Sequence, residues 1–132
     1  MALLTVLADA SIDAASAMYA PQRSALTAGE ALLALAPCVL RVDGLVYMSN
    51  GTAADANAQF DGFTAKAYAV GDSNVTLFGI GTKLRYAAGL TPGSKYYIGA
   101  TAGRLDTAAT VGDAVGVAKS VSATVIRITR DV

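Results

Sequence analysis

Glycine turns divide the sequence after residue 37 into short runs of β-branched and aromatic residues. Twelve of the 13 glycines lie in residues 38–132. The clearest turn is Asp43-Gly44, which separates the runs Val39–Val42 and Leu45–Met48. An Asp-Gly pair between two such runs is a strong signal for a β-hairpin. The pattern therefore predicts that this part of the chain folds as short strands joined by tight turns.

Alternation of side chains extends this prediction to the last residues. In the final run, Ile126 and Ile128 would share one face of a strand, whereas Val125 and Arg127 would share the other. We predict an all-β fold, a small β-barrel or sandwich of about seven or eight short, mainly antiparallel strands with an N-terminal arm. The candidate strands are residues 39–42, 45–48, 63–70, 74–80, 83–86, 95–98, 114–118 and 123–129.

Residues 1–36 differ in composition, with twelve alanines and only four charged residues. Thr27–Glu30 matches a helix capping box, and residues 11–20 could form a short helix that ends before Pro21. The alternative is an extended arm or a first strand, which we favour because an isolated helix of this length is marginally stable. We accordingly divide the chain into an N-terminal arm or first strand, residues 1–36, and a β-barrel or sandwich domain, residues 37–132.

An apolar stripe of Leu3, Leu4, Val6 and Leu7 begins the sequence. It is too short to span a membrane, and it lacks the basic flank of a signal peptide. Exposed apolar stripes mark partner surfaces, and an added edge strand would pair the backbone at the same time. We expect these four residues to form an interface, and residues 1–36 to be dispensable for folding but needed for attachment.

The charged residues exclude several functions. Ten basic and ten acidic residues cancel, so we expect no nucleic-acid partner and contacts that depend only weakly on salt. Histidine, the commonest general base and metal ligand, is absent. We therefore predict that the protein is not an enzyme and has no catalytic residue, cofactor or small-molecule substrate. The single cysteine, Cys38, lies in an apolar run and is predicted to be buried and structural.

One segment spaces its polar residues as a calcium loop does. Polar side chains stand at every second position of Asp55-Ala-Asn-Ala-Gln-Phe-Asp61, but Phe60 occupies the position that needs glycine. Lys66 stands where a glutamate would chelate the ion. We therefore predict no metal site.

The core must be modest for a chain of 132 residues, because 28 of them are alanine. Alanine buries little apolar area, and buried area supplies most of the stabilisation of a fold. We expect neighbouring copies to bury the rest in a closed homo-oligomer, a homotrimer.

Several blocks of glycine turns and small apolar strands share a family pattern. They are Ala28–Tyr47, Gly51–Asn57, Phe63–Tyr68, Gly89–Ile98, Ala102–Leu105, Val111–Ser120 and Ala123–Ile128. Together these blocks resemble, over about residues 27–130, the small capsid decoration (head cement) proteins of bacteriophages.

The resemblance implies a β-barrel or sandwich that binds the major capsid protein on the outer surface of the assembled head. It implies a trimer at three-fold or quasi-three-fold positions, which clamps coat subunits against the pressure of packaged DNA. The implied location is the virion, and the host cytoplasm during assembly. The alternative function is a phage tail or fibre surface module that binds a host receptor. That family has no catalytic residues to carry over.

Overall fold

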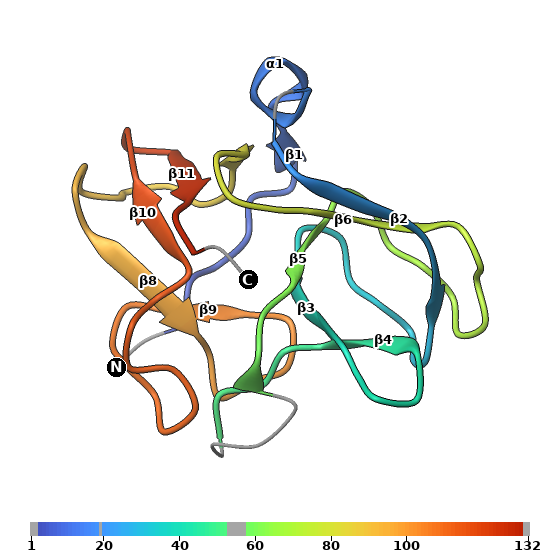
Figure 1. Ribbon diagram of the computed structural model, residues 1–132. Coiled ribbons are helices and arrows are strands. Elements are labelled where there is room, and N and C mark those ends of the chain that lie inside the picture. The colour runs from blue at the N-terminus through green and yellow to red at the C-terminus, as the bar shows by residue number, and fades with distance from the viewer. Residues whose placement is uncertain (1–2, 19, 53–57, 131–132) are drawn as a thin grey trace.

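The computed structural model describes residues 3–18, 20–52 and 58–130, and it confirms the all-β fold (Figure 1). Within those residues the chain forms eleven short strands and one helical turn. In chain order the elements are β1 (Ser11–Ile12), α1 (Ala14–Ala17), β2 (Gln22–Ala28), β3 (Pro37–Leu40), β4 (Leu45–Met48), β5 (Gly62–Thr64), β6 (Val75–Phe78), β7 (Lys83–Arg85), β8 (Lys95–Ile98), β9 (Leu105–Asp106), β10 (Ala118–Ser120) and β11 (Val125–Ile128).

These strands form two sheets. A closed barrel has the order β2-β4-β3-β5-β6, and a six-stranded sheet has the order β1-β7-β11-β10-β8-β9. Figure 1 shows them side by side, and we call them the barrel lobe and the sheet lobe. Among the described strand pairs, β2–β4 is parallel and the others are antiparallel, as the alternating pattern predicted.

The predicted hairpin joins β3 and β4, with Val39 opposite Tyr47. Its loop holds three residues rather than two, because the Arg41 N–H donates to Leu45 O at 3.0 Å. Gly44 takes a φ of 82°, the left-handed conformation that closes this common kind of hairpin loop. The longer loop moves Val42 from the predicted strand to a fully exposed position at the tip.

Other predicted strands agree with the structure to different degrees. β4 and β8 coincide with the predicted runs at 45–48 and 95–98. The run 63–70 is a strand only at its beginning, in β5. The predicted strand at 114–118 is instead a loop built around Asp113, and β10 starts at its last residue.

Each lobe has its own filled core. The barrel interior contains Ala28, Leu32, Ala36, Cys38, Val46, Tyr68, Val75 and Leu77. A larger cluster lies under the six-stranded sheet and includes Leu84, Tyr86, Ile98, Leu105, Ile126 and Ile128. Phe60 and Phe63 join this larger cluster and pack edge to face, with ring centroids 5.4 Å apart. Since Phe63 belongs to barrel strand β5, the larger core ties the two lobes together.

The described part of residues 1–36 belongs to this fold. β2 pairs with both β4 and β6, and so completes the barrel. A bulge between Arg23 and Leu26, where Ala25 has a φ of 60°, bends β2 from one neighbour to the other. The possible helices reduce to the single turn α1, and Thr27–Glu30 caps no helix. A domain boundary at residue 37 would therefore cut through a closed barrel.

Candidate interaction surfaces

The predicted interface residues pack against their own chain. The Leu4 N–H donates to Leu105 O and the Leu7 N–H donates to Tyr86 O, each at 2.8 Å. Leu4 and Val6 contact the larger core, and Leu3 bridges to Asp106. The stripe thus finds its apolar partners within the sheet lobe, and of its four residues Leu3 alone is exposed.

A shallow hollow lies beside this segment. It has a volume of about 330 Å³, and it is lined by Thr5, Val6, Leu33, Ala34, Gly103 and Arg104. Leu33 is 50% exposed there. The apolar surface that remains near the N-terminal segment is therefore contributed largely by the loop before β3.

The tip of the β3–β4 hairpin is held by a local network of polar contacts. The Tyr47 hydroxyl donates to Asp43 Oδ2 at 2.7 Å, and the Leu45 N–H donates to Asp43 Oδ1 at 3.0 Å. The Arg41 guanidinium lies over the Tyr47 ring, 4.8 Å from its centroid. The backbone bond from Leu45, followed by the bond from Tyr47, lowers the pKa of Asp43, and the bond to Asp43 raises the pKa of Tyr47.

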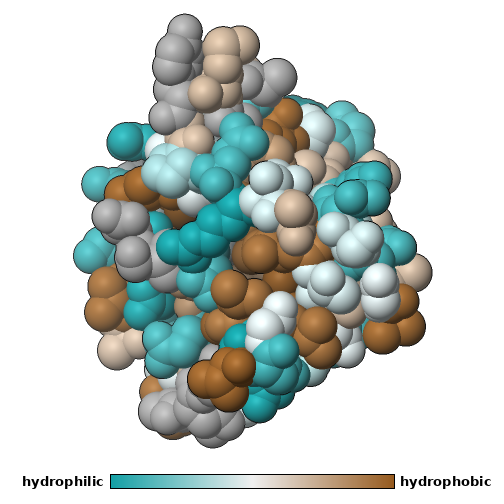
Figure 2. Space-filling view, turned by 45° about the vertical axis from the view of Figure 1, so that its right-hand side comes forward, coloured by the Kyte–Doolittle hydropathy of each residue, from teal (hydrophilic) through white to brown (hydrophobic). Residues whose placement is uncertain are grey.

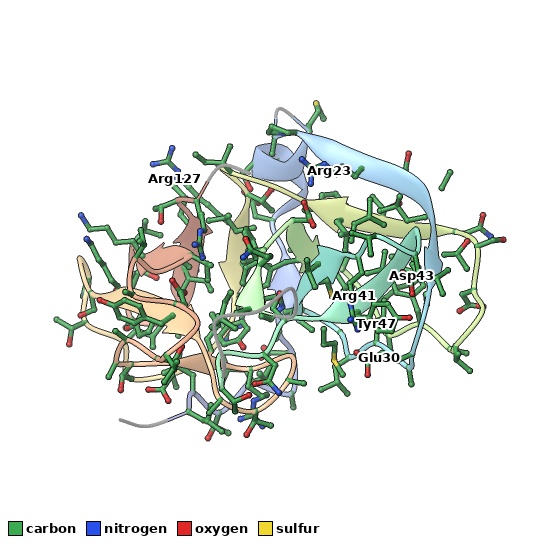
Figure 3. The ribbon with its side chains drawn as sticks, turned by 60° about the horizontal axis from the view of Figure 1, so that its bottom comes forward. Arg23, Glu30, Arg41, Asp43, Tyr47 and Arg127 are labelled. Carbon is green, nitrogen blue, oxygen red and sulfur yellow. The ribbon has the colours of Figure 1, made fainter. Side chains whose placement is uncertain are left out.

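Figure 3 shows that Arg41, Asp43, Tyr47 and Glu30 gather at the far end of the barrel lobe. Glu30 accepts a hydrogen bond from the Met48 N–H at 2.9 Å. Asp43, Tyr47 and Arg41 contact one another and Glu30 holds the end of β4, so together they stabilise the hairpin, whose tip residue Val42 is exposed.

A row of four cationic side chains crosses the outer face of the sheet lobe. Lys83 on β7 lies opposite Arg127 on β11, Arg127 lies opposite Lys119 on β10, and Lys119 lies opposite Lys95 on β8. All four are exposed, and the residues that alternate with them, such as Leu84 and Ile126, are buried. In the described part of the chain no ion pair links any of the four to a carboxylate. We call Lys83, Arg127, Lys119 and Lys95 the cationic row.

Sequence reasoning missed this row because it depends on strand register. The four residues lie as far apart as positions 83 and 127, and the whole chain carries no net charge. Alternation predicted that Arg127 faces outward, and the same rule could have been applied to Lys83, Lys95 and Lys119. What it could not supply is which strands are neighbours and which residues lie opposite one another.

Asp113 is the most heavily engaged acidic residue described. Its buried carboxylate accepts hydrogen bonds from the N–H groups of Ile98 at 2.9 Å, Val115 at 3.1 Å and Gly116 at 2.8 Å. Arg130 adds an ion pair at 3.3 Å. These contacts tie the loop before β10 to β8 and to the end of β11, which is a structural role.

The remaining candidates for chemistry are also structural. Asp61, from the calcium-like segment, accepts a hydrogen bond from the Leu40 N–H at 2.7 Å and pairs with Arg23. Phe60 is buried in the core, while Asp55 and Asn57 lie outside the described residues. Burial raises the pKa of Tyr86 to about 12, which keeps its hydroxyl neutral. Within the ranges that the structure describes, no cluster of three acidic or cysteine side chains could hold a metal ion.

The prediction for Cys38 is confirmed, since its side chain is fully buried inside the barrel. Burial, and secondarily the charge of Glu30, raises the pKa of the thiol far above its usual value. We expect a maleimide at pH 8 to modify the native protein at least about a hundredfold more slowly than the protein in urea. Mass spectrometry over time measures both rates, and equal rates would show that the barrel interior is open to solvent.

The fold and these surfaces define a two-lobed, all-β protein. Packed side chains fill the interior of each lobe, and the candidate binding groups are the cationic row and the apolar side chains on the surface. Comparisons with protein-family models, with curated proteins and with solved structures find no significant match to this chain. No helix among the described residues is long and apolar enough to cross a membrane.

Proposed function

We propose that this chain is a bacteriophage capsid decoration protein. It would bind the major capsid protein on the outer surface of the assembled head and stabilise the head against the pressure of packaged DNA. The observation that carries the proposal is where the family-like blocks fall. They supply the hairpin of β3 and β4 in the barrel lobe, and the turn before β8, β8 itself, β10 and β11 in the sheet lobe, so the resemblance includes strands of both lobes.

The filled interiors support a function carried by the outer surface. Both cores consist of packed side chains, and the polar groups of Asp113, Asp61 and Asp43 hold loops in place. Figure 2 shows hydrophobic residues gathered near the middle of one face, beside a band of hydrophilic ones. Such a mixture of apolar and polar surface is typical of protein–protein interfaces that form after each partner has folded.

The proposed mechanism is stabilisation by mass action. A protein that binds the assembled shell but not free coat subunits lowers the free energy of the shell in proportion to occupancy. Binding as a closed homotrimer would let one particle contact several coat subunits at once. Exposed valines that are available for such contacts among the described residues are Val42, Val70, Val111, Val115 and Val121.

Co-sedimentation with purified empty heads of the encoding phage tests this function. We expect the protein to sediment with heads, to ignore free coat subunits, and to raise the temperature at which heads lose their shape. Addition of a chelator should release none of it, since the proposal includes no metal. Binding to host cells but not to heads would support the tail or fibre function instead and would overturn the proposal.

A further inference from the structure

The cationic row places like charges side by side, which opposes the folding of the sheet. Directly opposite side chains on neighbouring antiparallel strands lie about 5 Å apart at Cβ, and like charges in such pairs are destabilising. The row contains three of these pairs in succession. Four of the ten basic residues of the chain are thus gathered on one sheet face, although the protein is neutral as a whole.

The row is separated from the acidic groups at the hairpin tip. Figure 3 shows Arg127 on the sheet lobe, at the opposite side of the molecule from Asp43 and Glu30. The overall neutrality therefore conceals a local concentration of positive charge on this face of the sheet. Net charge alone predicted contacts that depend only weakly on salt. The strand register that gathers four cations on one face instead predicts that binding through this face weakens as salt increases.

We propose that the cationic row binds a carboxylate-rich surface of a partner protein. The same sheet face already shows this chemistry within the chain, because Arg85, two residues from Lys83, pairs with Asp9 at 3.2 Å. Carboxylates from a partner would neutralise the remaining cations in the same way. They would also remove the repulsion between Lys83, Arg127 and their neighbours.

Two hollows beside the row offer apolar contacts to the same partner. One has a volume of about 530 Å³, and its lining combines the apolar Val121 and Val125 with the charged Lys83, Arg85 and Asp13. The other has a volume of about 240 Å³ and is lined in part by Lys95, Lys119 and Val115. Apolar contacts of this kind would add buried area, and the complementary charges would give the interface specificity and speed the encounter of the partners.

The shape of the charged surface favours acidic protein over nucleic acid. Strands lie about 4.8 Å apart, so the row extends for only about 14 Å. Duplex DNA carries a negative charge about every 1.7 Å along its axis and continues beyond any such row. A duplex that continued past Lys83 would meet Asp9 and Asp13, which are exposed at that edge of the sheet, whereas an acidic protein patch no longer than the row ends before them.

The test compares two variants that lose the same charge. The row variant is Lys119→Gln with Arg127→Gln. The matched control is Arg41→Gln with Lys66→Gln, which removes two cations that lie over tyrosine rings in the barrel lobe. The probes are poly-L-glutamate and a 20-base-pair DNA duplex, and binding is measured by fluorescence anisotropy at low and physiological salt.

We expect the wild-type protein to bind poly-L-glutamate more tightly than DNA, with an affinity that falls as salt increases. The row variant should lose at least tenfold in affinity for poly-L-glutamate, and the control less than twofold. Equal losses in the two variants would overturn the proposal. Tighter binding of DNA through the row would overturn it in favour of a nucleic-acid partner.

Thermal melting keeps this test interpretable. Removal of like-charged neighbours should leave the melting temperature of the row variant equal to or above that of the wild type. A row variant that fails to fold would contradict the expected repulsion between neighbouring cations. In that case the affinity for poly-L-glutamate is measured with Lys83→Gln and Lys95→Gln, which remove the two cations at the ends of the row. The inference is independent of the capsid proposal. Binding of poly-L-glutamate without binding of heads would overturn only the proposed function, and binding of heads by a protein that does not bind poly-L-glutamate through the row would overturn only the inference.

Discussion

Replacing Asp113 with alanine is expected to lower the free energy of unfolding by about 3–5 kcal/mol. The carboxylate is fully buried and accepts hydrogen bonds from Ile98, Val115 and Gly116. Alanine would leave these three N–H groups without a partner, and each unsatisfied buried donor costs about 1–3 kcal/mol. The Arg130 guanidinium would lose its ion pair as well. Urea denaturation followed by circular dichroism measures the loss.

Two further variants show whether burial is the cause. Asp72→Ala removes an exposed carboxylate that accepts one hydrogen bond from the Ala69 N–H, and it should cost only about 0.5–1 kcal/mol. Asp113→Asn keeps one acceptor oxygen but turns an N–H donor toward backbone donors, so its loss should be close to that of alanine. A change below about 1 kcal/mol in Asp113→Ala would contradict the account of this loop.

Deleting residues 2–26 is expected to abolish cooperative unfolding. The deletion removes Gln22, Arg23 and Leu26, through which β2 pairs with β6, and so opens the closed barrel along that edge of β6. It also removes Leu4 and Val6 from the larger core and β1 from its pairing with β7. This reverses the expectation from composition that residues 1–36 are dispensable for folding. The apolar stripe finds its partners within the chain.

Thermal denaturation and limited proteolysis measure the outcome. The truncated chain should show no sharp melting transition and should be digested rapidly, because β6 and β7 each lose a paired neighbour and the core beside them is exposed. Addition of a synthetic peptide of residues 1–28 should restore part of the protection if the missing strand is the cause. A truncated protein that melts cooperatively would contradict the assignment of β2 to the barrel.

The sequence predicted the parts of the fold that depend on local signals. The Asp43-Gly44 hairpin, strands β4 and β8 and the turn before β8 follow from turn residues and alternation over a few positions. Burial of Cys38 followed from its apolar neighbours. Each of these features is encoded within about ten residues of chain, which is the range over which such patterns act.

Features that depend on distant contacts could not be predicted in this way. β2 has the sequence Gln-Arg-Ser-Ala-Leu-Thr-Ala, which lacks alternation because a bulge at Ala25 interrupts its pairing. The run 114–118 has the composition of a strand. It forms a loop because the Asp113 carboxylate binds the N–H of the distant residue Ile98, a contact that the local sequence does not reveal. The cationic row arises from the register of four strands, and net charge hides it.

Cryo-electron microscopy of phage heads incubated with the protein tests the proposed function most directly. We expect additional density on the outer surface of the shell, arranged as three copies around three-fold or quasi-three-fold positions, into which the two lobes fit. Bare heads, or density confined to the tail, would contradict the capsid proposal.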